Sequence, residues 1–192
     1  QELLARYMLI GTDNRTKPNR KEPMTQQAEP QKSVKQPSAE GLAAAATEAA
    51  RRGPPPVHLW DPPFCGDLDI EIRRDGTWFY LGTPIGRPAL VRLFASILKL
   101  EAGRYYLVTP VEKVGIRVQD APFVAVDCTV EKVEGPEAGG QCGLRFATNV
   151  GDEVTAGPEH PLRIVFDGQG QPRPYVMVRR GLEALIDRKT FY

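Results

Sequence analysis

Large apolar residues are distributed unevenly along this chain, and their distribution limits where a core can form. Residues 11–40 contain no Leu, Ile, Phe, Trp or Tyr and are rich in Pro, Gln, Lys and Glu. Such a segment cannot bury enough apolar surface to offset the conformational entropy that is lost on ordering. We therefore expect a disordered leader over residues 1–56 and a folded body that begins at Val57.

One short helix is expected near the end of this leader. Residues 40–52 are rich in alanine, Ser38 is suited to the N-cap position, and Gly53 is suited to end the helix. Because an alanine face offers little apolar surface, we expect this helix to pack weakly. Removal of residues 1–53 is then expected to leave the stability of the body almost unchanged.

Net charge and cysteine content restrict the classes of partner and cofactor. The 192 residues carry a formal net charge of +1, so no basic domain is available and no nucleic-acid partner is expected. The three cysteines, Cys65, Cys128 and Cys142, show no CxxC spacing and have no histidine pair to complete a zinc site. We therefore predict no disulfide, no metal and no cofactor.

No segment of the sequence predicts membrane insertion or export. No apolar run approaches the ~20 residues that a spanning helix needs, and Leu3–Ile10 lacks the cleavage site of a signal peptide. We expect a cytoplasmic protein that does not bind membranes. Because the chain begins at Gln1 and Met24 offers an alternative start, it is open whether residues 1–23 belong to the native protein, and they are assigned no function.

Residues 57–118 are expected to form the first of two lobes. Apolar and charged residues alternate over 68–72, Asp75-Gly76 predicts a tight turn, and 78–81 supplies the returning strand of a hairpin. Apolar residues then recur at helical spacing over 87–100, with Pro88 in the first turn. The centre of this apolar stripe, expected to face the sheet, is formed by Leu93 and Phe94.

Residues 119–192 are expected to form the second lobe, which ends in a helix over 180–189. The remaining β-rich segments of both lobes are 105–108, 114–118, 123–133, 142–148, 162–166 and 174–178. The sequence thus predicts an α+β fold, in which two small lobes of antiparallel strands carry packed helices.

The sequences of the two expected lobes match at several positions. A shift of 92 residues (162 − 70) places Ile70 on Leu162, Asp75-Gly76 on Asp167-Gly168 and Arg87 on Arg179. This coincidence favours a repeated unit of strand, turn, strand and helix, although the apolar periodicity of two unrelated hairpins would produce part of it.

Several motifs occur in one order and spacing, namely Cys65-Gly66-Asp67 and the segments 75–85, 87–94 and 107–113. In these motifs the chain resembles the bacterial domain-of-unknown-function family 1285, over about Val57 to Tyr192. The resemblance implies a two-lobed α+β fold with repeated motifs and suggests a role in ligand binding or signalling. It implies no particular activity.

The sequence contains no complete catalytic set. His58 and His160 have no nucleophile at a recognised spacing, and there is no GxSxG, HExxH or P-loop motif. Cys65 is a candidate thiol nucleophile and Glu112 a candidate general acid or base, but free cysteines are more often packed, and Glu-Lys pairs are more often solvated. These observations favour binding over catalysis.

A cation at the start of the predicted 87–100 helix suggests a binding site. The partial positive charge of a helix N-terminus makes Arg87 unfavourable unless an anion lies nearby. With Thr83 in the preceding loop, and Thr109, Glu112 and Lys113 in a later turn, Arg87 could bind a small anionic ligand. Alternatively, Arg87 pairs within the protein with Asp67, Asp69 or Asp120.

These features together predict a binding module, with signalling as a role that the family resemblance suggests. Its partner is expected to be a small anionic ligand or another protein. The alternative is a hydrolase or transferase that acts on an anionic metabolite. The oligomeric state is not predicted.

Overall fold

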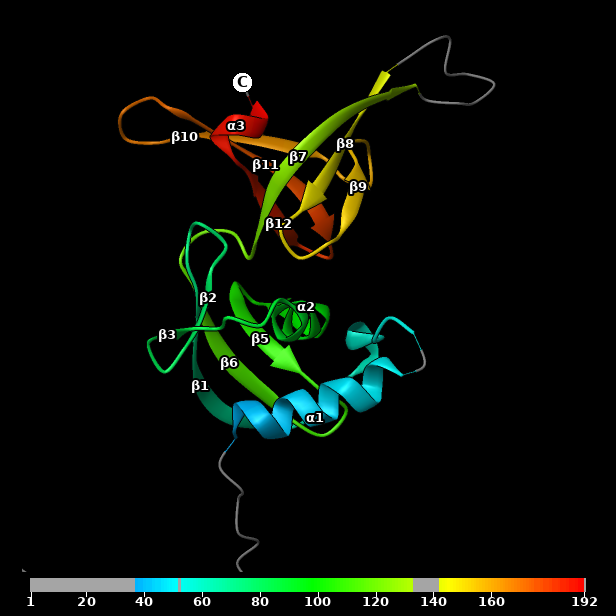
Figure 1. The fold of residues 1–192 in the computed structure, drawn as a ribbon, viewed down its shortest axis with the longest axis vertical. Coiled ribbons are helices and arrows are strands. Elements are labelled where there is room, and N and C mark those ends of the chain that lie inside the picture. Colours follow the sequence, from blue (N-terminus) through cyan, green and yellow to red (C-terminus); the bar gives the residue numbers. More distant parts are fainter. Residues whose placement is uncertain (1–36, 52, 133–141, 192) are drawn as a thin grey trace, which may run out of the picture. The chain divides into compact units, whose positions relative to one another are not determined.

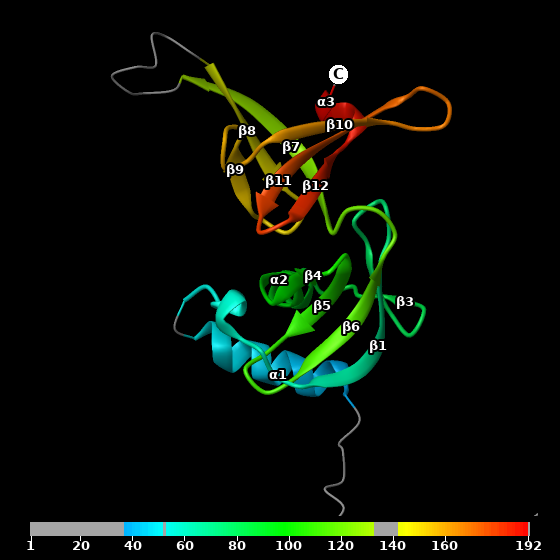
Figure 2. The same ribbon diagram turned by 180° about the vertical axis from the view of Figure 1, so that it is seen from behind.

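The structure, a computed structural model, describes residues 37–51, 53–132 and 142–191 (Figures 1 and 2). All of them belong to one compact unit of the chain, Lys35–Tyr192. The expected disorder of the leader up to residue 36 lies outside the described residues. No helix in the described part of the chain has both the length and the apolar character to cross a membrane.

The first lobe is built on a six-stranded sheet with the order β3-β2-β1-β6-β5-β4. Its strands are β1 (Phe64–Ile72), β2 (Trp78–Tyr80), β3 (Thr83–Pro84), β4 (Leu98–Glu101), β5 (Arg104–Val108) and β6 (Lys113–Val118). The predicted hairpin is confirmed, because β1 and β2 pair antiparallel with Ile72 opposite Trp78 and Ile70 opposite Tyr80.

The second lobe is built on another six-stranded sheet with the order β10-β11-β12-β7-β8-β9. Its strands are β7 (Phe123–Lys132), β8 (Cys142–Thr148), β9 (Glu153–Thr155), β10 (Leu162–Phe166), β11 (Pro172–Arg179) and β12 (Leu182–Ile186). The strands predicted at 142–148 and 162–166 are confirmed.

The two sheets share one topology, which corrects the expectation of purely antiparallel lobes. Each sheet consists of two antiparallel three-stranded meanders joined by one central parallel pair, β1 with β6 and β12 with β7. By strand order, β1–β3 therefore correspond to β7–β9, and β4–β6 correspond to β10–β12. The 92-residue shift instead matched the β1–β2 hairpin of the first lobe with the β10–β11 hairpin of the second, because both hairpins contain an Asp-Gly turn between apolar strands.

Within the described residues helices are few, and the fold is mostly β rather than evenly mixed. They are α1 (Ala39–Ala50), α2 (Pro88–Ser96), α3 (Arg188–Phe191) and a short 3₁₀ turn, η1 (Val57–Leu59). The predicted 87–100 helix ends early, because Ile97 leaves helical geometry and Leu98 begins β4 by pairing with Leu107.

The predicted terminal helix over 180–189 is wrong for most of its length. Residues 182–186 form β12, in which alternate residues are buried, and only the last residues form α3. Apolar residues at positions 182, 184 and 186 fit the two-residue period of a strand, whereas 182, 185 and 186 fit a helix equally well. Pairing with β7 and β11 decides in favour of the strand.

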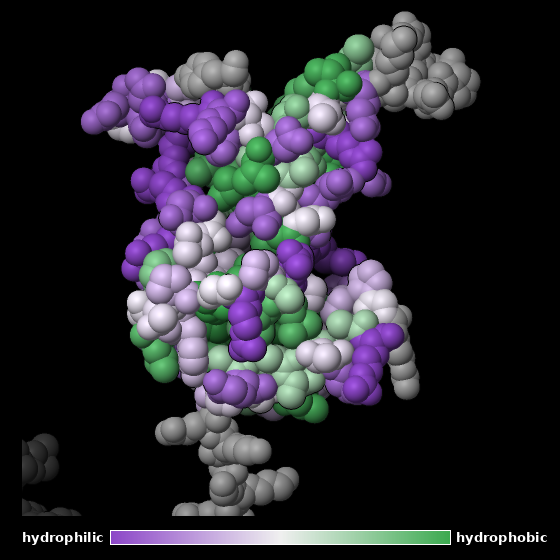
Figure 3. Space-filling view, viewed as in Figure 1, coloured by the Kyte–Doolittle hydropathy of each residue, from purple (hydrophilic) through white to green (hydrophobic). Residues whose placement is uncertain are grey.

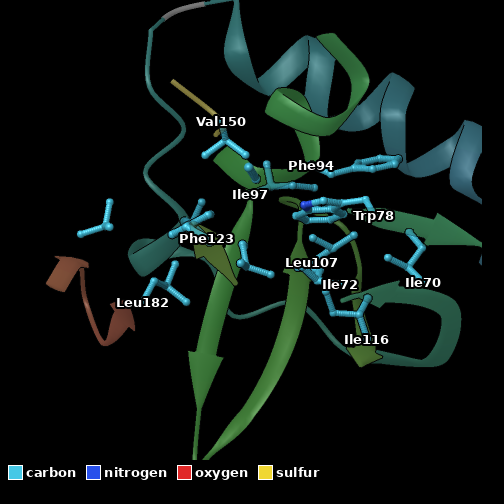
Figure 4. Packing of buried hydrophobic residues seen from close by; sticks show 14 of the residues in the cluster. Ile70, Ile72, Trp78, Phe94, Ile97, Leu107, Ile116, Phe123, Val150 and Leu182 are labelled. Carbon is cyan, nitrogen blue, oxygen red and sulfur yellow. The ribbon is translucent and has the colours of Figure 1, made fainter. Parts of the chain in front are cut away.

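One continuous apolar core contains residues from both lobes. Figure 4 shows the ring of Phe94 above that of Trp78, with their centroids 6.4 Å apart and an interplanar angle of 26°. Phe94 is fully buried, as predicted, whereas Leu93 is only partly buried at the border of the core. Phe123 and Leu182 of the second lobe belong to the same cluster.

The alanine-rich helix is present, but the expectation that it packs weakly is wrong. Ser38 caps α1 as predicted, by accepting a hydrogen bond from the Gly41 N–H at 3.1 Å. Leu42 and Ala46 are fully buried in the main core, so the small alanine side chains allow the helix to approach closely. Loss of residues 1–53 should therefore expose core surface and lower the stability of the body.

Leu42→Ala is expected to lower the free energy of unfolding by about 2–5 kcal/mol, because it leaves a cavity between α1 and the core. Urea unfolding of the full chain measures this difference. Thr47→Ala, on the exposed side of the same helix, is the control and should change the stability by less than about 0.5 kcal/mol. A loss below about 1 kcal/mol for Leu42→Ala would show that α1 is not part of the stable core.

Candidate ligand-binding cleft

Two of the predicted site residues, Thr83 and Arg87, border the same small cavity. Thr83 lies in β3, and Arg87 occupies the N-cap position of α2 without forming a side-chain capping bond. The cavity has a volume of about 250 Å³ and is also lined by α1 residues that include Glu40. Ligand contact by Thr83 and Arg87 remains a prediction.

The alternative prediction, in which Arg87 pairs with an internal carboxylate, is wrong for all three candidates. Among the described residues, no carboxylate oxygen lies within 4.0 Å of the Arg87 guanidinium. The three candidate carboxylates are bound to other arginines: Asp67 to Arg104, Asp69 to Arg117, and Asp120 to Arg173.

The other three predicted residues, Thr109, Glu112 and Lys113, lie at the turn between β5 and β6. Thr109 is fully buried, and its Oγ1 accepts hydrogen bonds from the N–H groups of Val111 and Glu112 at 3.4 and 3.2 Å. The side chain of Glu112 is half-buried. The Lys113 Nζ donates to Glu101 Oε2 at 2.9 Å. The hydrogen bonds of Thr109 and Lys113 stabilise the turn and the sheet edge.

The two halves of the predicted site do not converge. Lys113 is in register with Phe64 at the start of β1, whereas Thr83 is in register with Tyr80, which is opposite Ile70 near the other end of β1. Phe64 and Ile70 are separated by ~20 Å along the strand. The five residues therefore do not form one pocket.

A larger cleft, not predicted from the sequence, has a volume of about 470 Å³. The cleft is lined by segments that are distant in the chain, namely the β1–β2 turn, β7, the β10–β11 turn, the start of β11, the end of β12 and the start of α3. The lining residues are Arg74, Asp75, Val124, Val126, Asp167, Gln171, Pro172, Arg173, Pro174, Leu185, Ile186, Asp187 and Arg188.

Strand register gives this cleft an apolar floor. Val124 is opposite Leu185, and Leu185 is opposite Tyr175, so these three side chains share one face of the second sheet. Arg173 lies two residues before Tyr175 on β11 and therefore extends from the same face. Arg74 approaches the cleft from the β1–β2 turn of the first lobe.

Asp120, in the connection between the two sheets, links the arginines of the cleft. Its Oδ2 is bound by Arg173 and lies 3.7 Å from the Nε of Arg74, and its Oδ1 accepts a hydrogen bond from the Tyr175 hydroxyl at 2.9 Å. The Asp120 side chain is only 14% exposed. Burial, followed by the hydrogen bond and charge of Asp120, raises the pKa of Tyr175, so this hydroxyl stays protonated and donates.

The three carboxylates that line the cleft each hydrogen-bond to the backbone of their own turn. Asp75 Oδ1 accepts from the Thr77 N–H at 2.9 Å, and this bond lowers the pKa of Asp75. Asp167 Oδ1 accepts from the N–H groups of Gln171 and Gln169, and the pKa of Asp167 is lowered for the same reason. All three carboxylates, with Asp187 as the third, are expected to be ionised at neutral pH.

Burial acts on Asp187 in the opposite direction, by raising its pKa. The Thr190 N–H donates to its Oδ1 at 2.8 Å, and the hydrogen bonds from Thr190 and Lys189 outweigh burial, so the net pKa of Asp187 is lowered. Asp187 thereby caps α3 and places Arg188 at the rim of the cleft.

The chemistry that this cleft offers is hydrogen-bond donation from guanidinium groups above an apolar floor. Within residues 37–51, 53–132 and 142–191, no group of three or more His, Cys, Asp or Glu side chains is arranged to hold a metal ion. The sequence did identify both Asp-Gly turns that border the cleft, but nothing in it indicated that Arg74 and Arg173 would meet at Asp120.

Comparisons with known proteins agree with the two-lobed architecture. Residues 55–121 match the family described as "Domain of unknown function (DUF1285), N-terminal domain", and residues 122–192 match "Protein of unknown function (DUF1285), C-terminal domain". No curated protein matches the chain.

Two crystal structures of DUF1285 family proteins are similar to this chain. The one from Silicibacter pomeroyi DSS-3 is 62% identical, with a TM-score of 0.70 over 81% of this chain and 82% of that chain. The one from Shewanella baltica OS155 is 30% identical, with a TM-score of 0.49 over 65% of this chain and 88% of that chain. By its match to both family descriptions over residues 55–192, the chain belongs to the DUF1285 family.

Proposed function

We propose that this protein binds a small organic anion in the cleft lined by Arg74, Arg173 and Arg188. The observation that carries the proposal is that Arg74 and Arg173 share a single carboxylate, that of Asp120. Asp120 can pair closely with only one of the two guanidinium groups, so N–H donors of the other are available to a ligand carboxylate or phosphate, although the three lining aspartates offset the formal charge of the three lining arginines.

The availability of donors supports an anion rather than a cation. The lining aspartates each use one carboxylate oxygen to accept hydrogen bonds from their own turns. The Arg74 side chain is 65% exposed and only 3.7 Å from Asp120 at its closest, so most of its N–H donors are free to bind a ligand. Among the described residues, Arg188 forms no ion pair within 4.0 Å.

The size and floor of the cleft support an organic ligand rather than an inorganic ion. A volume of about 470 Å³ lies within the range of small-molecule sites, which commonly occur between lobes. Val124, Val126 and Leu185 would contact the apolar body of a ligand while the arginines bind its charged group. A metabolite that carries a carboxylate or phosphate ester on an apolar or aromatic body fits this description.

Thermal shift of the full chain with benzoate, hexanoate, AMP and inorganic phosphate tests the proposal. A ligand at ten times its Kd adds about 1.4 kcal/mol to the stability of the folded state, which raises the melting temperature. We expect the organic anions to raise it more than inorganic phosphate does. Arg74→Ala should weaken this binding about tenfold or more, because a charge-assisted hydrogen bond contributes about 1.5–3 kcal/mol.

Arg117→Ala is the matched control for the loss of charge. Its side chain is 64% exposed, close to the value for Arg74, but it pairs with Asp69 on the first sheet and does not line the cleft. Ligand binding by Arg117→Ala should equal that of the original protein. The proposal fails if none of the organic anions raises the melting temperature, or if both variants lose binding equally.

A further inference from the structure

Strand β10 is an edge strand with an unusual amount of exposed apolar surface. It pairs only with β11 among the described strands. Leu162, Ile164 and Phe166 alternate along it and are 47%, 52% and 67% exposed. Figure 3 shows that the neighbouring β10–β11 turn is hydrophilic.

The equivalent edge of the first lobe is covered. By strand order, β4 corresponds to β10, and β4 contacts η1. The Nζ of Lys99 on β4 also donates to the Trp60 carbonyl at 3.0 Å, directly after η1. Leu98 of β4 is buried. In the described part of the second lobe, no segment covers β10 in this way, and all five of its residues are exposed.

The backbone of β10 has a row of hydrogen-bonding groups that point away from β11. The Met177 N–H donates to the Pro161 carbonyl at 3.1 Å, and the Asp167 N–H donates to the Gln171 carbonyl at 3.0 Å. Hydrogen-bonded pairs alternate with non-bonded pairs in an antiparallel ladder, so Arg163 and Val165 bond to β11. The N–H and C=O groups of Leu162, Ile164 and Phe166 then point to the free edge.

The strand also lacks the features that usually prevent edge-to-edge pairing. No proline interrupts residues 162–166, and the register with β11 shows no bulge. The single charged residue, Arg163, is held by Glu183 through two hydrogen bonds, of 3.0 and 2.5 Å. Uncovered edges of this kind tend to pair with another strand.

We infer that β10 pairs antiparallel with β10 of a second copy of this chain, about a two-fold axis at Ile164. In this register, Ile164 is opposite Ile164 of the partner subunit, and Leu162 is opposite Phe166 of the partner subunit. All outward backbone groups of the three residues then find partners. The six apolar side chains form one continuous stripe, because they lie on the same face of the joined sheet.

Charge complementarity favours a second copy as the partner. In this register Arg163 lies opposite Val165 of the partner subunit, and it is a diagonal neighbour of Asp167 of the partner subunit, within reach of an arginine side chain. The two-fold axis produces this contact twice. The two Arg163 side chains are also diagonal neighbours, but each is already balanced by its own Glu183. No two like charges face each other directly.

Sedimentation equilibrium of the full chain, from about 1 to about 500 µM, is expected to show a monomer–dimer equilibrium. Ile164→Lys would place two cations directly opposite each other and should weaken the dimer about tenfold or more. Ile164→Pro removes only an N–H that points away from β11, so it should weaken the dimer while keeping the β10–β11 pairing. Gln169→Lys in the adjacent exposed turn is the control and should dimerise like the original protein.

A cysteine variant tests the register and does not depend on the charged or proline variants folding well. Ile164→Cys should form a disulfide-linked dimer under mild oxidation, because directly opposed Cα atoms in a hydrogen-bonded pair are ~5.5 Å apart. Gln169→Cys, with the same native cysteines, should not. A protein that stays monomeric at the highest concentration would overturn the inference, as would a dimer unaffected by Ile164→Lys and Ile164→Pro. Equal cross-linking of the two cysteine variants would refute the proposed register.

Discussion

Replacement of Phe94 by alanine is expected to lower the free energy of unfolding by about 3–5 kcal/mol. Phe94 is fully buried and stacks on Trp78, so the substitution removes a large apolar side chain and leaves a cavity beside an indole ring that cannot easily collapse. The loss is measured by urea or guanidinium unfolding with two independent probes, Trp fluorescence and circular dichroism.

Leu59→Ala is the control for this change. Leu59 is 72% exposed in η1, so its truncation should alter the stability by less than about 0.5 kcal/mol. If Phe94→Ala costs less than about 1 kcal/mol, α2 does not pack on the first sheet in the way described.

Gly76→Ala is expected to destabilise the protein by about 2–5 kcal/mol, for two reasons that add. Gly76 has a φ of 80°, in the left-handed region that a side chain disfavours. A Cβ at this position would also lie 2.5 Å from the Asn149 Nδ2 and 3.0 Å from a methyl group of Val124. In the native protein, Asn149 donates to the Gly76 carbonyl at 3.2 Å and accepts from the Val124 N–H at 3.0 Å. The added methyl group would displace the Asn149 side chain and strain both hydrogen bonds.

Gly168→Ala provides a matched control within the same molecule. Gly168 follows Asp167 as Gly76 follows Asp75, but no atom lies within 4 Å of its Cβ position and its φ is not left-handed. Thermal or urea unfolding should therefore show a change of less than about 0.5 kcal/mol. Equal effects of the two substitutions would mean that the contact with Asn149 is not present in solution.

The contrast between these glycines shows what an Asp-Gly pair in a sequence can predict. Both pairs correctly predicted a turn between two strands, because short-range backbone preferences are enough to specify a hairpin. The sequence could not distinguish the turn that packs against Asn149 from the turn that is exposed. That difference depends on a residue 73 positions away from Gly76.

The candidate site illustrates the same limit. Arg87 was singled out because the helix dipole acts locally, and Thr83 does border the same cavity. The prediction wrongly placed Lys113 in the same site as these residues, because strand order within a sheet is not encoded in local patterns. Two arginines of the larger cleft, Arg74 and Arg173, come from a turn of the first lobe and a strand of the second, and they meet at Asp120.

By itself, the sequence determined the strand and turn positions of both hairpins, the start of α2, the capping of α1 by Ser38 and the burial of Phe94. These features follow from side-chain periodicity and from backbone preferences that extend over a few residues. Only the tertiary structure decided that α2 ends at Ser96, that residues 182–186 form a strand, and that each sheet has a central parallel pair. In these places helix and strand patterns are nearly equivalent locally, and pairing with strands distant in the chain decides between them.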